Sequence, residues 1–217
     1  ASSYHGNYGG PGVIRNWSGT IVEHSTTYPQ AWWGASNQHA YFGIEAISDG
    51  TSSTALFSER LLGLSVNLGL RPGTPNAKRG IYQTGSQIWH TGYGFGLGDP
   101  AAALNWLQQC RSAPNTRHSV GSYLSGAHWS LADPWHTSNM AYNHYNTPNG
   151  LTCTAAGGES PWGGGAGIIT ATSDHPGGVN VCLADGSVRF VKDTVAIETW
   201  WALGTKNGGE VISSDQY

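Results

Sequence analysis

The chain has 217 residues, of which 11% are charged, and its formal net charge is −3 at pH 7. This length can bury the core of one domain, and the weak charge leaves no basic surface of the kind that binds nucleic acids or anionic membranes. No run of 18 apolar residues occurs, which argues against a membrane-spanning helix. The sequence begins with Ala1 and shows no export signal, so we expect either that a leader was removed or that the chain is part of a longer polypeptide.

The first forty residues combine turn-forming residues with aromatic side chains and show no helical period. This composition predicts loops and short strands. A short helical turn is expected around residues 44–50, ending at Asp49-Gly50, and a strand is expected over residues 54–60.

The clearest helix begins with Asp99 as the N-cap and Pro100 at the first helical position. It is expected to stop near Ala113-Pro114. A long stretch rich in Trp, His, Asn and Gly follows from Thr116 to Gly167 and is predicted to be irregular. Loops of this length are usually functional or assembly surfaces.

The last fifty residues are the best specified part of the chain. Two alternating runs, Val179–Ala184 and Ser187–Val191, flank Asp185-Gly186. This pattern predicts a hairpin with a two-residue turn, in which both turn residues take positive φ angles. A short helix is expected from about Ala196 to Leu203, with Gly204 as its C-cap.

The three cysteines show no C-x-x-C spacing, which argues against a zinc or redox motif. Cys110 lies in the expected helix and Cys153 in a loop rich in Gly and Thr. Cys182 lies in the alternating run, where a small buried side chain is expected. A disulfide between Cys110 and Cys153 is therefore predicted, with Cys182 free, and the alternative is three reduced thiols.

The sequence offers no clear catalytic motif. The nine histidines form no H-E-x-x-H pair, and His128, His136 and His144 are expected to be surface or core residues. No G-x-S-x-G motif anchors a serine hydrolase, and the glycine-rich residues 92–98 lack the Lys-Ser/Thr of a phosphate loop. We expect no enzyme, and a metal-dependent hydrolase is the weakest alternative.

Ten tryptophans and ten tyrosines are the remaining compositional signal. Neighbouring strand residues point to opposite faces, so one member of Trp32-Trp33 and one of Trp200-Trp201 is expected to be exposed or to contact another subunit. Exposed aromatic rings stack on sugars or anchor protein interfaces, and the alternative is that they surround a small core. The candidate binding residues are Trp32, Trp33, Trp129, Trp135 and Trp162.

Three segments, residues 47–59, 175–190 and 201–211, carry a family resemblance. In the second, His175 and Asp185 are separated by nine residues, and the other signature positions are Gly177, Gly178 and Gly186. Together the segments resemble the bacterial prepilin-type, processing-associated H-x9-DG proteins, a family of unknown function once loosely labelled solute-binding. The resemblance implies a pseudopilin-like globular head without the prepilin leader and the long apolar helix of that family.

A strand of about six residues between His175 and Asp185 would span roughly 20 Å, so the two side chains are not expected to share one ion. We interpret the signature as specifying the start of a strand and its tight exit. The alternative is a metal site that pairs Asp174 with His175 or gathers loop carboxylates such as Asp185 around calcium, as resemblance to secretion pseudopilins implies.

The sequence therefore predicts one α+β domain over residues 1–217, with an antiparallel sheet, a loop-rich part at about 61–167 and a better specified part at 168–217. The expected function is that of a non-enzymatic structural protein, extracellular or on the cell surface, which self-associates into a filament or envelope assembly. A carbohydrate- or solute-binding module that uses exposed tryptophans is the alternative. No cofactor is expected, with calcium as the alternative, and neither nucleic-acid binding nor membrane insertion is expected.

Overall fold

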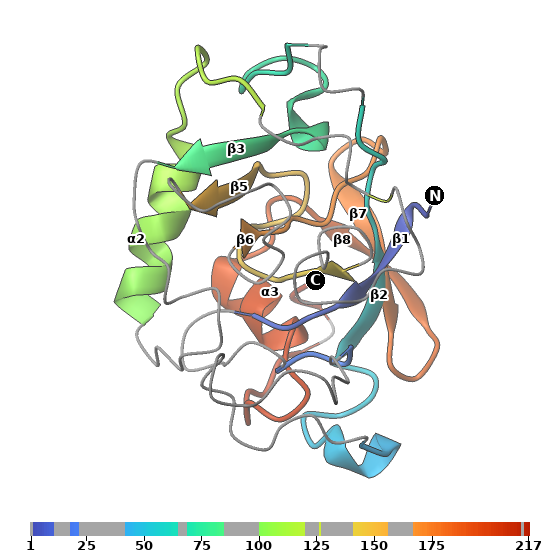
Figure 1. Cartoon of the computed structure of the whole chain (residues 1–217). Coiled ribbons are helices and arrows are strands. Elements are labelled where there is room, and N and C mark those ends of the chain that lie inside the picture. Colours follow the sequence, from blue (N-terminus) through green and yellow to red (C-terminus); the bar gives the residue numbers. More distant parts are fainter. Residues whose placement is uncertain are drawn as a thin grey trace, which may run out of the picture.

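The computed structural model describes residues 2–10, 18–21, 42–64, 69–84, 100–119, 126, 141–155, 167–213 and 215–217. These residues form an α+β fold with two β-sheets, two α-helices and two short 3₁₀ turns, η2 (Ile44–Ala46) and η3 (Ala77–Arg79) (Figure 1). The expected fold class is confirmed. Neither of the two α-helices is long and apolar enough to cross a membrane.

The larger sheet has five strands in the order β4-β1-β2-β7-β8. Its central strands are antiparallel, as predicted, whereas β4 runs parallel to β1 and comes from the segment predicted to be irregular. In chain order the strands are β1 (Tyr4–Asn7), β2 (Ala55–Glu59), β4 (Ala141–Tyr142), β7 (Gly178–Leu183) and β8 (Val188–Lys192).

The smaller sheet consists of β3 (Ile81–Thr84), β5 (Thr152–Ala155) and β6 (Gly167–Ile168). Strand β3 runs parallel to β5, and β6 pairs antiparallel with β5. The helix α2 (Pro100–Arg111) lies beside this sheet (Figure 1). It ends slightly before Ala113-Pro114, where the sequence predicted its end.

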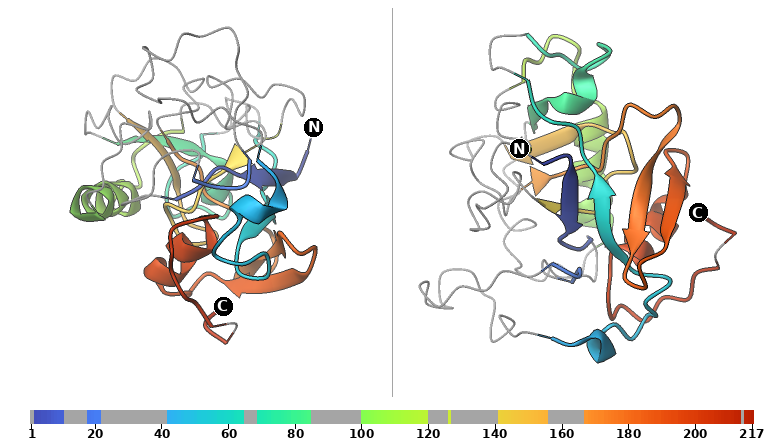
Figure 2. Two further views of the ribbon diagram at one scale, coloured as in Figure 1. Left: turned by 90° about the horizontal axis from the view of Figure 1, so that it is seen from below. Right: turned by 90° about the vertical axis from the view of Figure 1, so that its right-hand side faces the viewer.

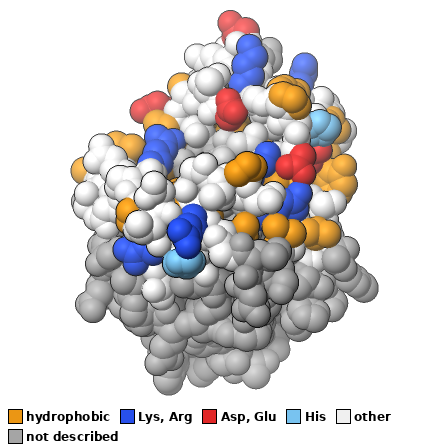
Figure 3. Space-filling view, turned by 90° about the horizontal axis from the view of Figure 1, so that it is seen from above, with side chains coloured by type: hydrophobic (Ala, Val, Ile, Leu, Met, Phe, Trp, Pro, Cys, Tyr) orange, Lys and Arg blue, Asp and Glu red, His pale blue; other side chains and the backbone are white. Residues whose placement is uncertain are grey.

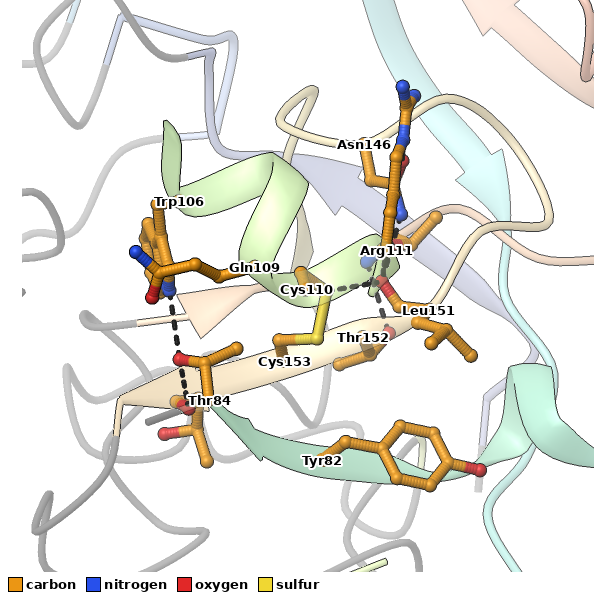
Figure 4. The surroundings of a disulfide bond; sticks show 12 residues. Tyr82, Thr84, Trp106, Gln109, Cys110, Arg111, Asn146, Leu151, Thr152 and Cys153 are labelled. Atoms are coloured by element: carbon orange, nitrogen blue, oxygen red, sulfur yellow. Dashed lines mark hydrogen bonds between the residues drawn. A yellow bond between two sulfur atoms is a disulfide. The ribbon is translucent and has the colours of Figure 1, made fainter. Parts of the chain in front are cut away.

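A disulfide between Cys110 of α2 and Cys153 of β5 fixes the helix to the sheet, with the two Cα atoms 5.8 Å apart (Figure 4). This pairing confirms the sequence prediction. One turn before Cys110 in the same helix, the indole Nε1 of Trp106 donates a hydrogen bond to Thr84 Oγ1 at 3.1 Å. Cys182 is free, as predicted, but it is half-buried rather than part of the core.

The helix α3 (Ile197–Leu203) agrees with the predicted one, but both of its tryptophans are buried. Trp200 packs against the ring of His144 with a centroid distance of 4.0 Å, and Trp201 Nε1 donates to Tyr145 O. The expectation that one of this pair is exposed is wrong, because it assumed the alternating directions of a strand. This short helix is buried along most of its length, so adjacent side chains both reach the core.

Gly204 ends α3 with a right-handed φ of −77°, not with the left-handed conformation of a typical C-cap glycine. A Cβ atom at this position would lie 2.6 Å from His144 Cγ. Glycine is needed here because the histidine ring approaches the backbone closely.

The core lies on the inner side of the five-stranded sheet. Val179, Val181 and Leu183 of β7 and Val191 of β8 are fully buried there. Figure 2 (right) looks onto the opposite, outward side of β1, β2, β7 and β8, with α2 and the smaller sheet behind them. The outward side is therefore the side of the sheet that the helices leave uncovered.

Candidate functional site

The tryptophans predicted to bind a ligand cannot be placed, because they lie outside the described residues. They are Trp32, Trp33, Trp129, Trp135 and Trp162. The described tryptophans Trp106, Trp200 and Trp201 are all buried, so none of them presents a ring to a ligand at the surface.

The first half of the H-x9-DG signature forms the start of β7. Gly177 has a positive φ of 78°, which favours glycine, and Gly178 lies beneath the ring of Phe190. A Cβ atom on Gly178 would lie 2.8 Å from the Cζ atom of Phe190. The two glycines thus serve the backbone turn and the close cross-strand approach, as the structural interpretation of the signature predicted.

The second half of the signature forms the hairpin loop, but this loop has three residues rather than two. Gly186 N donates to Leu183 O at 2.9 Å, and Leu183 N donates to Ser187 O at 2.8 Å. Gly186 has a φ of 86°, whereas Asp185 does not take a positive φ. This is a type I turn followed by a left-handed glycine, because the loop includes Ala184 as well.

His175 bridges to β2 rather than to Asp185. Its Nε2 atom lies 3.2 Å from Glu59 Oε1, and the same carboxylate accepts hydrogen bonds from the backbone N–H and the side-chain amide of Asn180. Burial works to raise the pKa of Glu59, but the hydrogen bonds from Asn180 and Ser173 and the charge of His175 hold this pKa below 4.5. The cluster therefore keeps a carboxylate ionised beside the start of β7.

The three candidate metal ligands have separate partners. The carboxylate of Asp174 pairs with Arg79 Nη2 at 2.7 Å and with Lys78 Nζ at 3.4 Å. Figure 3 shows acidic and basic side chains intermixed on one face of the molecule. Asp185 accepts from the backbone N–H and hydroxyl of Ser187, and His175 contacts Glu59. No group of three His, Cys, Asp or Glu side chains suited to a metal occurs in the described parts of the chain.

A small pocket of about 80 Å³ opens beside Glu59, at the ends of β1 and β2. Arg60 lines it and is almost completely buried, and burial lowers its pKa to about 10, so it stays protonated at neutral pH. Its Nη1 atom donates to Thr170 O and Thr152 Oγ1. This guanidinium thus links the end of β2 to β5 and to the segment that follows β6.

The outward side of the larger sheet carries an apolar row, which we define as Phe57, Cys182, Val188 and Phe190. The register pairs Phe57 with Cys182 and Cys182 with Val188, so these side chains lie side by side across three strands. Phe57 is 41% exposed, Val188 63% and Phe190 45%. Large exposed apolar side chains gathered on one face are typical of an interaction surface.

Sequence reasoning found the strands of this row but not the row itself. The run from Val188 to Val191 has apolar residues on both faces, which is compatible with a strand buried on both sides. In the structure the core covers only the inner side of the sheet, so only Val191 reaches it, and Val188 and Phe190 project from the uncovered side. The signal that could have found the row was the position of Val188 and Phe190 two residues apart in the last strand.

A family model described as a protein of unknown function (DUF1559, SBP_bac_10) matches residues 2–198. This match covers most of the chain, which therefore belongs to that family. No curated protein and no solved structure matches the chain.

Proposed function

We propose that this DUF1559 protein is a structural subunit rather than an enzyme, and that it associates with copies of itself outside the cell. In this proposal the described fold is the globular head of a pseudopilin-like protein, as the resemblance to the prepilin-type H-x9-DG proteins implies. The assembly is a filament or an envelope structure.

The apolar row is the observation that carries this proposal. Phe57, Val188 and Phe190 are exposed, and the strand register puts them on the side of the sheet opposite to the buried side chains of β7 and β8. Burying such side chains against another protein surface removes them from water and stabilises the contact. Because the row lies on strands that are hydrogen-bonded into the fold, it is held rigid before any partner arrives.

Two further features support an extracellular, assembled protein. The Cys110–Cys153 disulfide is typical of proteins that fold in an oxidising compartment. The low fraction of charged residues and the net charge of −3 give copies of the chain little electrostatic repulsion.

Sedimentation velocity over a range of micromolar concentrations tests the proposal. We expect the mean sedimentation coefficient to rise with protein concentration, and the rise to be reduced by Val188→Ser, which removes apolar surface from the row without touching the core. A chain that stays monomeric at every concentration would contradict the proposal. Monomers that bind oligosaccharides would instead favour the alternative in which the tryptophans form a glycan-binding surface.

A further inference from the structure

We propose that two copies of the chain join their β8 strands edge to edge, in antiparallel orientation, about a two-fold axis that passes beside Phe190. The inference rests on the proposed self-association and names the surface that mediates it. Strand β8 is an edge strand: it pairs with β7 on one side, and no strand of the described residues pairs with its other side. Exposed edges of this kind are templates for pairing with another chain.

The hydrogen bonds at both ends of the hairpin show which backbone groups of β8 point to the open side. Leu183 N donates to Ser187 O, and Asp193 N donates to Gly177 O. In an antiparallel pair the hydrogen-bonded positions alternate, so Arg189 and Val191 also bond toward β7. The N–H and C=O groups of residues 188, 190 and 192 therefore point away from β7, toward a partner strand.

The register follows from charge and from the number of residues that can pair. Centring the pair on Phe190 places Val188 opposite Lys192 of the partner subunit and Arg189 opposite Val191 of the partner subunit. All five residues of β8 then have a partner, with about six backbone hydrogen bonds and no like charges opposite each other. Centring it on Arg189 would place two arginines directly opposite, which destabilises a pair of strands. Centring it on Val191 would pair only part of the strand.

This register also brings the apolar rows together. Val188 and Phe190 project from the same face of β8. Each Phe190 ring leans over Gly178 of its own β7, so the two rows continue side by side across the axis on one face of the joined sheet. The two five-stranded sheets would become one continuous sheet. A contact of this symmetry closes on itself, so a filament would need a second, different contact between such dimers.

Charge-swap variants test the register by sedimentation equilibrium of the full chain. Val188→Lys places a lysine opposite Lys192 of the partner subunit twice in each interface, and we expect dimerisation to weaken by about tenfold or more. Adding Lys192→Glu converts both repulsive pairs into attractive ones and restores dimerisation. Lys192→Glu alone, the control, creates no like-charge pair and keeps the dimer. Since residue 188 is exposed at a sheet edge, where lysine is well tolerated, Val188→Lys is expected to fold normally.

A cross-linking measurement checks the same register independently. In a Cys182→Ser background, Phe190→Cys places two thiols opposite each other about 5.5 Å apart at Cα, within the range of a disulfide, so mild oxidation should give a covalent dimer. Arg189→Cys is the matched control and should stay uncross-linked, because its opposite residue is a valine. Self-association that Val188→Lys leaves unchanged, or equal cross-linking of both cysteine variants, would overturn the edge pairing. A wild-type chain that never self-associates would overturn the proposed function as well.

Discussion

Next to the Cys110–Cys153 disulfide the inner side of α2 is buried, whereas two of the three apolar side chains of β8 are exposed. Trp106 and Leu107 of α2 are buried against the smaller sheet, and the disulfide fixes their helix in place. On β8, only Val191 is buried. The buried apolar side chains of α2 thus stabilise the fold, whereas the exposed ones of β8 are available to contact another molecule.

Substitutions in the two regions should therefore change two different quantities, the free energy of unfolding and the strength of self-association. A substitution in the α2 region should lower the free energy of unfolding and leave association unchanged where the chain still folds. A substitution on the apolar row should do the reverse, because side chains that remain exposed in the folded chain gain little from folding.

The largest effect is expected for Trp106→Ala. This side chain is fully buried and hydrogen-bonded to Thr84, so we expect the free energy of unfolding to fall by about 3–5 kcal/mol. Leu104→Ala on the same helix is the control, because Leu104 is exposed and should cost less than about 1 kcal/mol. Urea unfolding measures both. Equal losses would show that α2 does not pack as described.

Removing the disulfide is expected to cost slightly less. Replacing both Cys110 and Cys153 by Ser opens a covalent loop with a sequence separation of 43 and should lower the free energy of unfolding by about 2–4 kcal/mol. Cys182→Ser should change it by less than about 1 kcal/mol, because that thiol is free and half-buried. A larger loss of stability from Cys182→Ser than from the double replacement would contradict the claim that the α2 region contributes more to stability than the outward side of the larger sheet.

Lowering the pH should reduce the free energy of unfolding because two histidines are buried in the folded chain. Burial lowers the pKa of both His5 and His144 from 6.5 to about 3, with the charge of Arg60 adding to the shift of His5. The unfolded chain therefore binds protons that the folded chain does not, so stability falls as pH falls from 6.5 toward 3. The expected loss is about 1.4 kcal/mol per pH unit for each histidine.

The lowered pKa of Glu59 acts in the same direction, but only below its unfolded value of 4.5. Urea unfolding between about pH 7.5 and pH 4.5 measures the histidine contribution, and His144→Gln should reduce the slope by about half. A free energy of unfolding that stays constant over this interval would contradict the burial of two neutral histidines.

Two glycines, one in the interior and one in the β7–β8 hairpin loop, should respond to alanine for different reasons. Gly204→Ala forces a Cβ atom against His144 and should cost about 1–3 kcal/mol, although its φ suits any residue. At Gly186 nothing lies within 4 Å of a Cβ atom, and the cost of about 1 kcal/mol comes from the positive φ alone. Gly186→Asn, which tolerates positive φ, should recover part of it, whereas Gly204→Asn should not.

The sequence predicted the parts of the fold that depend on local pattern. The strand at Ala55–Glu59, the helix α2, the β7–β8 hairpin and the helix α3 follow from turn residues and periodicity, and the disulfide follows from where the three cysteines lie in these segments. The predicted N-cap of α2, Asp99, lies outside the described residues. The two-residue turn was wrong because the loop length depends on which cross-strand pair closes the hairpin.

Contacts between distant segments could not be predicted in the same way. Glu59 and His175 meet because β2 and β7 are neighbours in the sheet, and nothing in either segment specifies that order. The apolar row depends on a similar fact, since it is exposed because neither described helix covers the outward side of the larger sheet. Trp200 and Trp201 were expected to be partly exposed but are buried. Trp200 packs against His144, a residue far away in the sequence, and no local pattern predicts that contact.

Hydrogen exchange of the β8 amides at low and high protein concentration tests the central claim most directly. The amides of Arg189 and Val191 bond toward β7 and should be protected at both concentrations. The amides of Val188, Phe190 and Lys192 should exchange rapidly in dilute solution and become protected when copies associate. Self-association that leaves these three amides exchanging rapidly would contradict the claim that β8 is the surface through which the chain assembles.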